Sequence, residues 1–207
     1  MPTSGYIANF LIAVILIVGG YQFYFLVQRR HLRTPIELQM SIDGLIPFRP
    51  GWVWIYSGLY YPVILLLVFT TSSFAQFNYT AFSFITLLAM QIIVFYAFPV
   101  KIPKEWRNYD PTKSLSTRFL AIVHSYDGLP NSIPSMHVSV SMLAALHLFD
   151  HLSPALGRYA FISFLFPILI SVSALFTKQH YVIDILPGAF LGYVNYHIFR
   201  FYSTEIS

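Results

Sequence analysis

Residues 79–100 read YTAFSFITLLAMQIIVFYAFPV, a run of 22 residues without one charged side chain. A helix needs about 20 apolar residues to cross the hydrocarbon core of a bilayer. This run is therefore long enough to span a membrane as a helix. A helix on the surface of a soluble protein would carry charged residues on its outer face, and this run carries none.

Similar runs lie on both sides of this one. They cover Tyr6–Val27, Trp52–Thr71, Ile133–Phe149, Tyr159–Phe176 and Tyr181–Phe199. We expect the six runs to form an all-α integral membrane bundle of six transmembrane helices, with residues 1–207 as a single domain. The first run is longer than the apolar region of a typical signal peptide and has no basic segment before it, so we expect it to be retained.

The composition excludes a soluble domain. Hydrophobic residues make up 57% of the chain and charged residues only 10%, whereas soluble domains carry about a quarter charged residues. The chain has no cysteine, which excludes disulfides and a cysteine nucleophile. Membrane topology and anionic lipid explain the net charge of +4 better than nucleic acid does. We therefore expect the bilayer, and no nucleic acid, as a partner.

Basic residues are unequally distributed between the two predicted membrane faces. Only Arg158 and Arg200 lie on one face, and the other ten follow the first, third and fifth runs, namely Arg29, Arg30, Arg33, Arg49, Lys101, Lys104, Arg107, Lys113, Arg118 and Lys178. The positive-inside rule places the richer face in the cytoplasm. Some of these charges are also candidates for substrate binding, which weakens the bias.

Asp184 is a charged residue inside the last predicted run. A carboxylate in a span costs about 2.5–3.5 kcal/mol on insertion scales, so it indicates a functional site. His180 lies four residues earlier, and on a helix this spacing puts both side chains on one face. The carboxylate can then hold one imidazole nitrogen and leave the other free to attack. A structural polar pair near the interface is the alternative.

Pro134, Ser135 and His137 stand at the start of the fourth run. Proline and serine just before an apolar run are typical of a helix start, so we expect His137 in the first turn. The N–H groups around Ser135 would attract a phosphate, and His137 could give a proton to a departing oxygen. The alternative is a capping serine followed by a structural histidine.

Lys101, Lys104 and Arg107 follow the third run directly. Interfacial lysines commonly reach toward water and orient helices, which is the structural explanation. In the six-helix topology, however, this cluster leaves the membrane at the same face as His137 and His180. We therefore expect these basic side chains to bind the phosphate on which the histidines act.

These motifs resemble those of the superfamily that contains the type 2 phosphatidic acid phosphatases, the vanadium haloperoxidases and the sphingolipid phosphotransferases. The Pro-Ser-x-His block of that superfamily matches in full. The superfamily has three such blocks, and the third is a Ser-Arg pair followed by a histidine and then an aspartate. It matches Ser173, His180 and Asp184, with Ala174 where the phosphatases carry arginine. The run 175–184 is more similar to the inositolphosphotransferase and sphingomyelin synthase branch. The resemblance covers residues 99–188, where the catalytic motifs are concentrated, and its lysine-arginine block is the loosest, because Asn108 follows Arg107 in place of proline.

The resemblance implies a lipid phosphotransferase with a phosphohistidine intermediate and no cofactor or metal. His180, held by Asp184, would attack the phosphorus of a phospholipid donor, and His137 would protonate the leaving alcohol. A lipid or small alcohol would accept the phospho-head group. The implied phosphate-binding residues are Lys101, Lys104, Arg107, Ser135 and Lys178, of which Lys178 replaces part of the charge missing at Ala174. The resemblance also implies an extracytoplasmic active site, which we expect in place of the cytoplasmic site.

Three other functions fit parts of the sequence. A lipid phosphate phosphatase of the phosphatidic acid type would use water as the acceptor in the same site. A membrane haem protein would explain helical histidines, but not Asp184 one turn from His180; the histidines concerned are His137, His147, His180 and His197. A non-catalytic lipid-binding protein is the third, because the motif arginine is absent.

Overall fold

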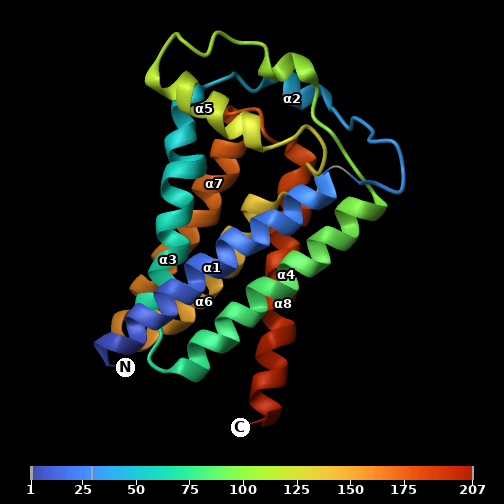
Figure 1. Ribbon diagram of the computed structural model, residues 1–207. Helices are drawn as coiled ribbons and strands as arrows, with labels where there is room; N and C mark the ends of the chain where they lie inside the picture. Colours follow the sequence, from blue (N-terminus) through green and yellow to red (C-terminus); the bar gives the residue numbers. More distant parts are fainter. Residues whose placement is uncertain (1, 29, 207) are drawn as a thin grey trace.

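The computed structural model describes residues 2–28 and 30–206, and the regular structure in them is helical apart from two isolated β-bridges. The long helices lie alongside one another in a bundle (Figure 1). In chain order the elements are α1 (Thr3–Gln28), α2 (Ser41–Leu45), η1 (Pro50–Trp52), η2 (Trp54–Leu59), α3 (Tyr60–Thr70), α4 (Phe74–Ala97), η3 (Lys104–Arg107), α5 (Leu115–Tyr126), α6 (Met136–Leu156), η4 (Gly157–Phe164), α7 (Leu165–Phe176) and α8 (Val182–Ile206).

Among the described residues, 5 helical stretches are long and apolar enough to cross a membrane. The fourth stretch, Met136–Phe176, is 41 residues long and contains both the fourth and the fifth predicted runs. It is not one straight rod, because Gly157 has a φ of 53°, a conformation that glycine adopts without strain. After this residue the chain turns back, and α7 packs against α6. The chain is thus a helical membrane protein.

The third predicted run begins and ends at other residues than expected. Helix α4 begins at Phe74, five residues before the predicted start, because the Ser73 side chain accepts the N–H of Gln76 and caps the helix at 3.1 Å. The same helix ends at Ala97, since the residue before Pro99 disfavours the helical region.

The second run contains a π-helix, which the sequence analysis did not predict. Residues Trp54–Leu59 form this wider turn, and regular α-helix follows from Tyr60. Pro62 is the third residue of α3, and its ring nitrogen cannot donate a backbone hydrogen bond. The π-helix ends three residues before this proline, and such turns are frequent at functional sites.

Helix α6 is the centre of the bundle. It contacts α3, α4, α7 and α8, and it shares a buried apolar cluster with α3 and α7, formed by Tyr60, Leu67, Val138, Ala144, Leu148, Phe166 and Ile170. Large apolar side chains on the outer faces of the other helices are exposed, as expected for surfaces that face lipid; they include Leu11, Ile15, Phe82, Ile93 and Phe190.

Helices α6 and α8 approach each other most closely at two glycines. A Cβ atom on Gly188 would lie 2.7 Å from the backbone oxygen of Ser135, and one on Gly192 would lie 2.3 Å from that of Ser139. Both distances are shorter than any normal contact. The four-residue spacing of the glycines repeats that of the two serines, a pattern of small residues that lets membrane helices pack closely.

Polar segments gather at one end of the bundle, and both chain termini lie at the other end (Figure 1). This polar end contains α2, α5, the start of α6 and the start of α8. The close contact of α6 and α8 therefore also determines how the residues just before these two helices face each other.

We expect Gly192→Ala to lower the free energy of unfolding by about 1–3 kcal/mol, because the new methyl group meets a backbone oxygen that cannot move aside. The measurement is the thermal midpoint of the purified protein in detergent. Gly19→Ala is the matched control, since nothing lies within 4 Å of its Cβ position. Equal midpoints for the two variants would contradict the role assigned to the α6–α8 contact.

Candidate active site

His180 and Asp184 are joined at the polar end of the bundle. The imidazole Nδ1 of His180 lies 3.2 Å from Asp184 Oδ2 and 2.9 Å from the backbone oxygen of Ser132. A backbone oxygen and an ionised carboxylate can accept hydrogen bonds but cannot donate them, so Nδ1 carries the proton. Nε2 is then left with its lone pair.

The carboxylate of Asp184 is held by the start of α8. It is the third residue of this helix, and its Oδ2 also accepts the N–H of Tyr181 at 2.9 Å. A carboxylate at this position satisfies a free N–H group of the helix end and is stabilised by the helix dipole. His180 itself precedes α8. The i,i+4 spacing predicted that both side chains lie on one helical face. In the structure the pair forms instead across the start of the helix.

His137 lies in the first turn of α6, as predicted. Its ring is stacked on that of Tyr56 at 4.2 Å between centroids and packs against Tyr60 at 4.6 Å. The Tyr56 hydroxyl lies 2.8 Å from His137 Nδ1. The centroids of the His137 and His180 rings are 6.5 Å apart, so the two imidazoles are near neighbours.

Ser135 caps α6 and ties this helix to α8. Its hydroxyl accepts the N–H of Val138 at 3.4 Å, and its own N–H donates to the backbone oxygen of Asp184 at 3.2 Å. The start of α6 thus lies directly beside the start of α8. Two helix N-termini, each with the positive end of its dipole, converge at the histidines.

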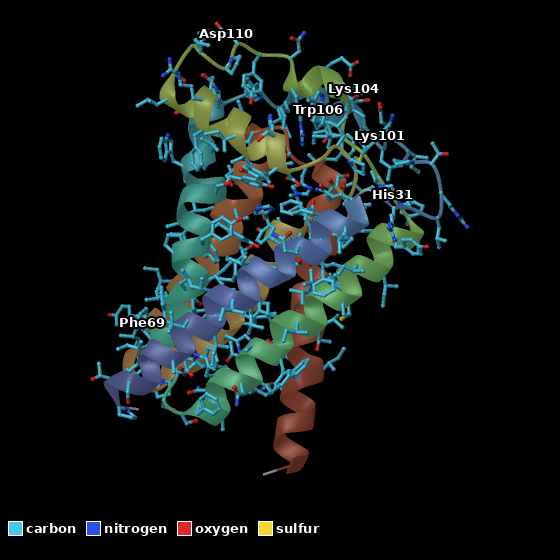
Figure 2. The ribbon with its side chains drawn as sticks, in the orientation of Figure 1. His31, Phe69, Lys101, Lys104, Trp106 and Asp110 are labelled. Carbon is cyan, nitrogen blue, oxygen red and sulfur yellow. The ribbon has the colours of Figure 1, made fainter. Side chains whose placement is uncertain are left out.

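The predicted cations lie at different depths. Figure 2 shows Lys101 and Lys104 beside Trp106 at the polar end of the bundle. Lys101 pairs with Glu37 at 3.3 Å, with 39% of its side chain exposed, and Lys104 is exposed. In the described part of the chain, no hydrogen bond or ion pair joins either lysine to a histidine, so their role in phosphate binding stays a prediction.

Arg107 and Lys178 lie deeper. The Arg107 guanidinium donates to the backbone oxygens of His124, Asp127 and Gly128 and to Oε1 of Gln179, which precedes His180. Burial lowers the pKa of Arg107, and burial together with the neighbouring Arg107 charge lowers that of His124 to about 3. His124 is therefore neutral near pH 7.

Lys178 is nearly buried beside the site. Its Nζ donates to the backbone oxygen of Asp43 at 2.8 Å and lies 4.8 Å from the centroid of the Trp106 ring. Burial lowers the pKa of its ammonium group. Asp43 also accepts the N–H of Val182 at 2.8 Å. A single acidic residue of α2 thus fixes both Lys178 and the first residue of α8.

A family model described as the PAP2 superfamily matches residues 49–198. The chain belongs to the PAP2 superfamily. The match includes every predicted site residue, from Lys101 to Asp184, and excludes α1 and α2.

Two individual proteins are similar to this member of the PAP2 superfamily. An uncharacterized protein of Methanocaldococcus jannaschii is 33% identical over 75 residues, which are 36% of this chain and 29% of that protein. The match thus spans under a third of the relative's length. A crystal structure of a transmembrane PAP2-type phosphatidylglycerolphosphate phosphatase from Bacillus subtilis is 18% identical, covers 98% of each chain and has a TM-score of 0.49.

Several residues beside the histidines were missed or left out by the sequence analysis. Tyr56 and Asp43 come from segments far from the motifs, and nothing in the local pattern distinguishes Tyr56 from the other aromatic residues of its span. Asp43 could have been noticed as an acidic residue within a short polar segment. Gln179 directly precedes His180, and Ser132 lies two residues before Pro134, so the motifs themselves were the available signal.

Proposed function

We propose that this chain is a membrane lipid phosphotransferase that moves a phospho-head group from a phospholipid to an alcohol through a phosphohistidine on His180. The observation that carries the proposal is that two acceptors, Asp184 Oδ2 and the backbone oxygen of Ser132, lie within hydrogen-bond distance of His180 Nδ1. A protonated Nδ1 leaves Nε2 as a nucleophile without any prior proton transfer. This is the arrangement that covalent catalysis by histidine requires.

Asp184 acts on His180 in two ways. It holds the imidazole in the Nδ1–H tautomer, and it stabilises the positive charge that develops on the ring when Nε2 bonds to phosphorus. Its own position is secured from two elements, since Tyr181 donates to its carboxylate and Ser135 donates to its backbone oxygen. The charge therefore develops next to a carboxylate that needs no rearrangement.

His137 is the general acid and base. In the imidazolium form of His137, Nδ1–H donates to the Tyr56 hydroxyl oxygen, and the proton on Nε2 is available to the leaving alcohol. After departure of the alcohol, the same nitrogen accepts the proton of the incoming alcohol. His137 and His180 thus begin the reaction in opposite protonation states, His137 as an imidazolium and His180 as a neutral imidazole.

The phosphate lies between the two histidines in this proposal. Arg107 and Lys178 supply positive charge, and the N–H groups at the Ser135 end of α6 point toward phosphoryl oxygens. Lys101 and Lys104, farther out, attract the phosphate group of an approaching lipid.

A lipid substrate is supported by an apolar pocket that borders the site. The pocket has a cavity volume of about 160 Å³ and lies between α1, α3, α4 and α6. Tyr60 and Met136 belong to its lining. Tyr60 packs on the His137 ring, and Met136 precedes His137 in the chain. A substrate with its phosphate at the histidines therefore has an apolar pocket beside it for the acyl part.

An alcohol acceptor is favoured over water by the motif form of residues 175–184 and by Ala174, which is fully buried and offers no guanidinium. The active site lies at the extracytoplasmic face in this proposal. The basic residues near the histidines bind the phosphate in this proposal. They therefore increase the number of positive charges at this face without indicating that the face is cytoplasmic.

His180→Ala should lower turnover by about 10⁴-fold or more, because the covalent step is lost. The assay follows phosphorus from phosphatidic acid alone and from phosphatidylinositol with ceramide. Transfer to ceramide supports the phosphotransferase, and inorganic phosphate indicates a phosphatase. The control is His197→Ala, because His197 is an exposed histidine of α8. Brief incubation with labelled donor should leave an acid-labile label on the wild type and on His197→Ala but not on His180→Ala. Full activity of His180→Ala would refute the mechanism.

Tyr56→Phe keeps the stacked ring and removes the hydrogen bond to His137. We expect about a 10-fold to 100-fold loss of kcat for esters of alkyl alcohols, which need a proton on departure, and little loss for 4-nitrophenyl esters, which do not. Tyr24→Phe is the matched control, since it removes a buried hydroxyl that bonds to Asp127. An equal loss with both kinds of ester would mean that Tyr56 has only a structural role.

The face of the active site can be tested with single cysteines, because the chain has none of its own. Lys104→Cys lies at the polar end and Arg158→Cys beyond the far end of α6, and both positions are exposed. An impermeant thiol reagent should label the first variant in intact cells and the second only after permeabilisation. The reverse pattern would place the site in the cytoplasm.

A further inference from the structure

Helix α5 has an apolar side that the described residues, 2–28 and 30–206, leave uncovered. The helix crosses the polar end of the bundle at an angle to α3 (Figure 1). Its side chains Leu115, Ile122 and Tyr126 are 74%, 56% and 69% exposed. The three positions follow one another at spacings of seven and four residues, so they lie on one side of the helix. A row of large exposed apolar side chains marks a surface that meets a partner or lipid.

The rest of the exposed surface of α5 is polar. Arg118 and Ser125 are exposed and lie on the neighbouring side of the helix. The buried side contains Thr117 and Leu120. The exposed surface is thus divided lengthwise into an apolar half and a polar half. A helix at a lipid–water interface has this division, because one half meets lipid and the other half meets water.

The start of α5 lies at the depth where the second membrane span begins. That span runs over Pro50–Thr70. Trp54, near its beginning, donates from Nε1 to Oγ of Ser116 at 3.1 Å, and its ring lies 5.0 Å from that of Phe119 between centroids. Tryptophan is enriched where a bilayer meets water. Helix α5 is therefore at the level of the interface and not far out in the water.

The apolar side of α5 adjoins the lipid-facing surface of this span. Trp54 is itself exposed, as are Leu66 and Phe69 farther along the same span. Phe119, which packs on Trp54, is four residues after Leu115 and three before Ile122, and such positions are neighbours on a helix surface. Trp54 and Phe119 thus connect the outer face of the span with the apolar side of α5.

The charge of the α5 segment fits a phospholipid surface. Residues 111–126 contain the basic residues Lys113 and Arg118 and no acidic residue. Both side chains are exposed, and so is that of Arg49, which precedes the η1 turn that α5 contacts. Basic side chains next to an apolar surface bind the phosphate groups of lipid headgroups.

Helix α5 is held in its orientation at both ends. Its first turn is bonded to Trp54, as described above. At its last turn the Arg107 guanidinium donates to the backbone oxygens of His124 and Asp127, and the Tyr24 hydroxyl donates to the Asp127 carboxylate at 2.8 Å. The outward direction of the apolar side is therefore a fixed property of the fold.

We propose that α5 is an interfacial helix whose Leu115, Ile122 and Tyr126 side chains are inserted among the phospholipids around the second span, where headgroups meet acyl chains. The occupant of this surface is the surrounding bilayer and not a protein. Because Arg107 bonds to the end of α5, the bilayer then supports one wall of the candidate site. This placement does not depend on the chemistry of that site.

The test measures the depth of single spin labels in the whole protein, reconstituted into vesicles of phosphatidylcholine and phosphatidylglycerol. The chain has no cysteine of its own, so one nitroxide can be attached to Leu115→Cys or to Ile122→Cys. Ser125→Cys, in the polar half of the same helix, is the matched control. Electron paramagnetic resonance gives the collision rate of each label with oxygen, which dissolves in lipid, and with a nickel chelate, which stays in water.

Two further labels provide the reference values. Ile15→Cys in α1 gives the value for lipid, since Ile15 is exposed within a span, and Glu105→Cys gives the value for water, since Glu105 is exposed at the polar end. We expect the ratio of oxygen to nickel collisions at positions 115 and 122 to exceed that at position 125 by about threefold or more. The two positions are seven residues apart, so a local disturbance by one label leaves the other reading intact.

Two results would overturn the proposal. Ratios at positions 115 and 122 that equal the ratios at positions 125 and 105 would mean that the apolar side faces water. Spectral broadening at these positions that disappears when labelled protein is diluted with unlabelled protein would mean that a second copy of the chain covers the surface in place of lipid.

Discussion

The close approach of α6 and α8 is the contact on which the site depends. Gly188 and Gly192 allow the backbones of these helices to meet at Ser135 and Ser139, and the N–H of Ser135 reaches the backbone oxygen of Asp184. In a bilayer, such packing relies on close van der Waals contact, since lipid chains solvate apolar side chains equally well. The helix starts that carry the two histidines are thereby held together. A wider crossing would separate His137 from His180.

The fold was largely predictable from sequence because the bilayer imposes one strong requirement. Uncharged runs of about 20 residues must be helices, and the observed helices follow the predicted runs. Helix boundaries were less predictable, since they depend on local events such as the Ser73 cap and the π-turn before Pro62. Gly157 has a similar local effect, and the turn after α6 depends on its backbone conformation. The spacing of Gly188 and Gly192 was a readable signal that the sequence analysis did not use.

The motifs predicted the contact between His180 and Asp184 better than the surroundings of the basic residues. His180 and Asp184 are four residues apart, so their contact depends on local backbone alone, and they are bonded as expected. The partners of Arg107 and Lys178 come from segments far along the chain, and spacing within a motif carries no information about them. The same is true of Tyr56, whose hydroxyl meets His137 across 81 positions. Residues that act through distant contacts become visible only in three dimensions.

Asp43 joins the segment before the family match to the start of α8. The residues that match the family begin at position 49, which suggests a self-sufficient catalytic unit preceded by an accessory segment. Yet Asp43 accepts the N–H of Val182, and its backbone oxygen holds Lys178. The segment outside the family match thus closes the start of the helix that carries Asp184. Natural variation in this segment therefore has a direct route to the reaction centre, and relatives that share the motifs can diverge in activity through a part of the chain that their motifs do not include.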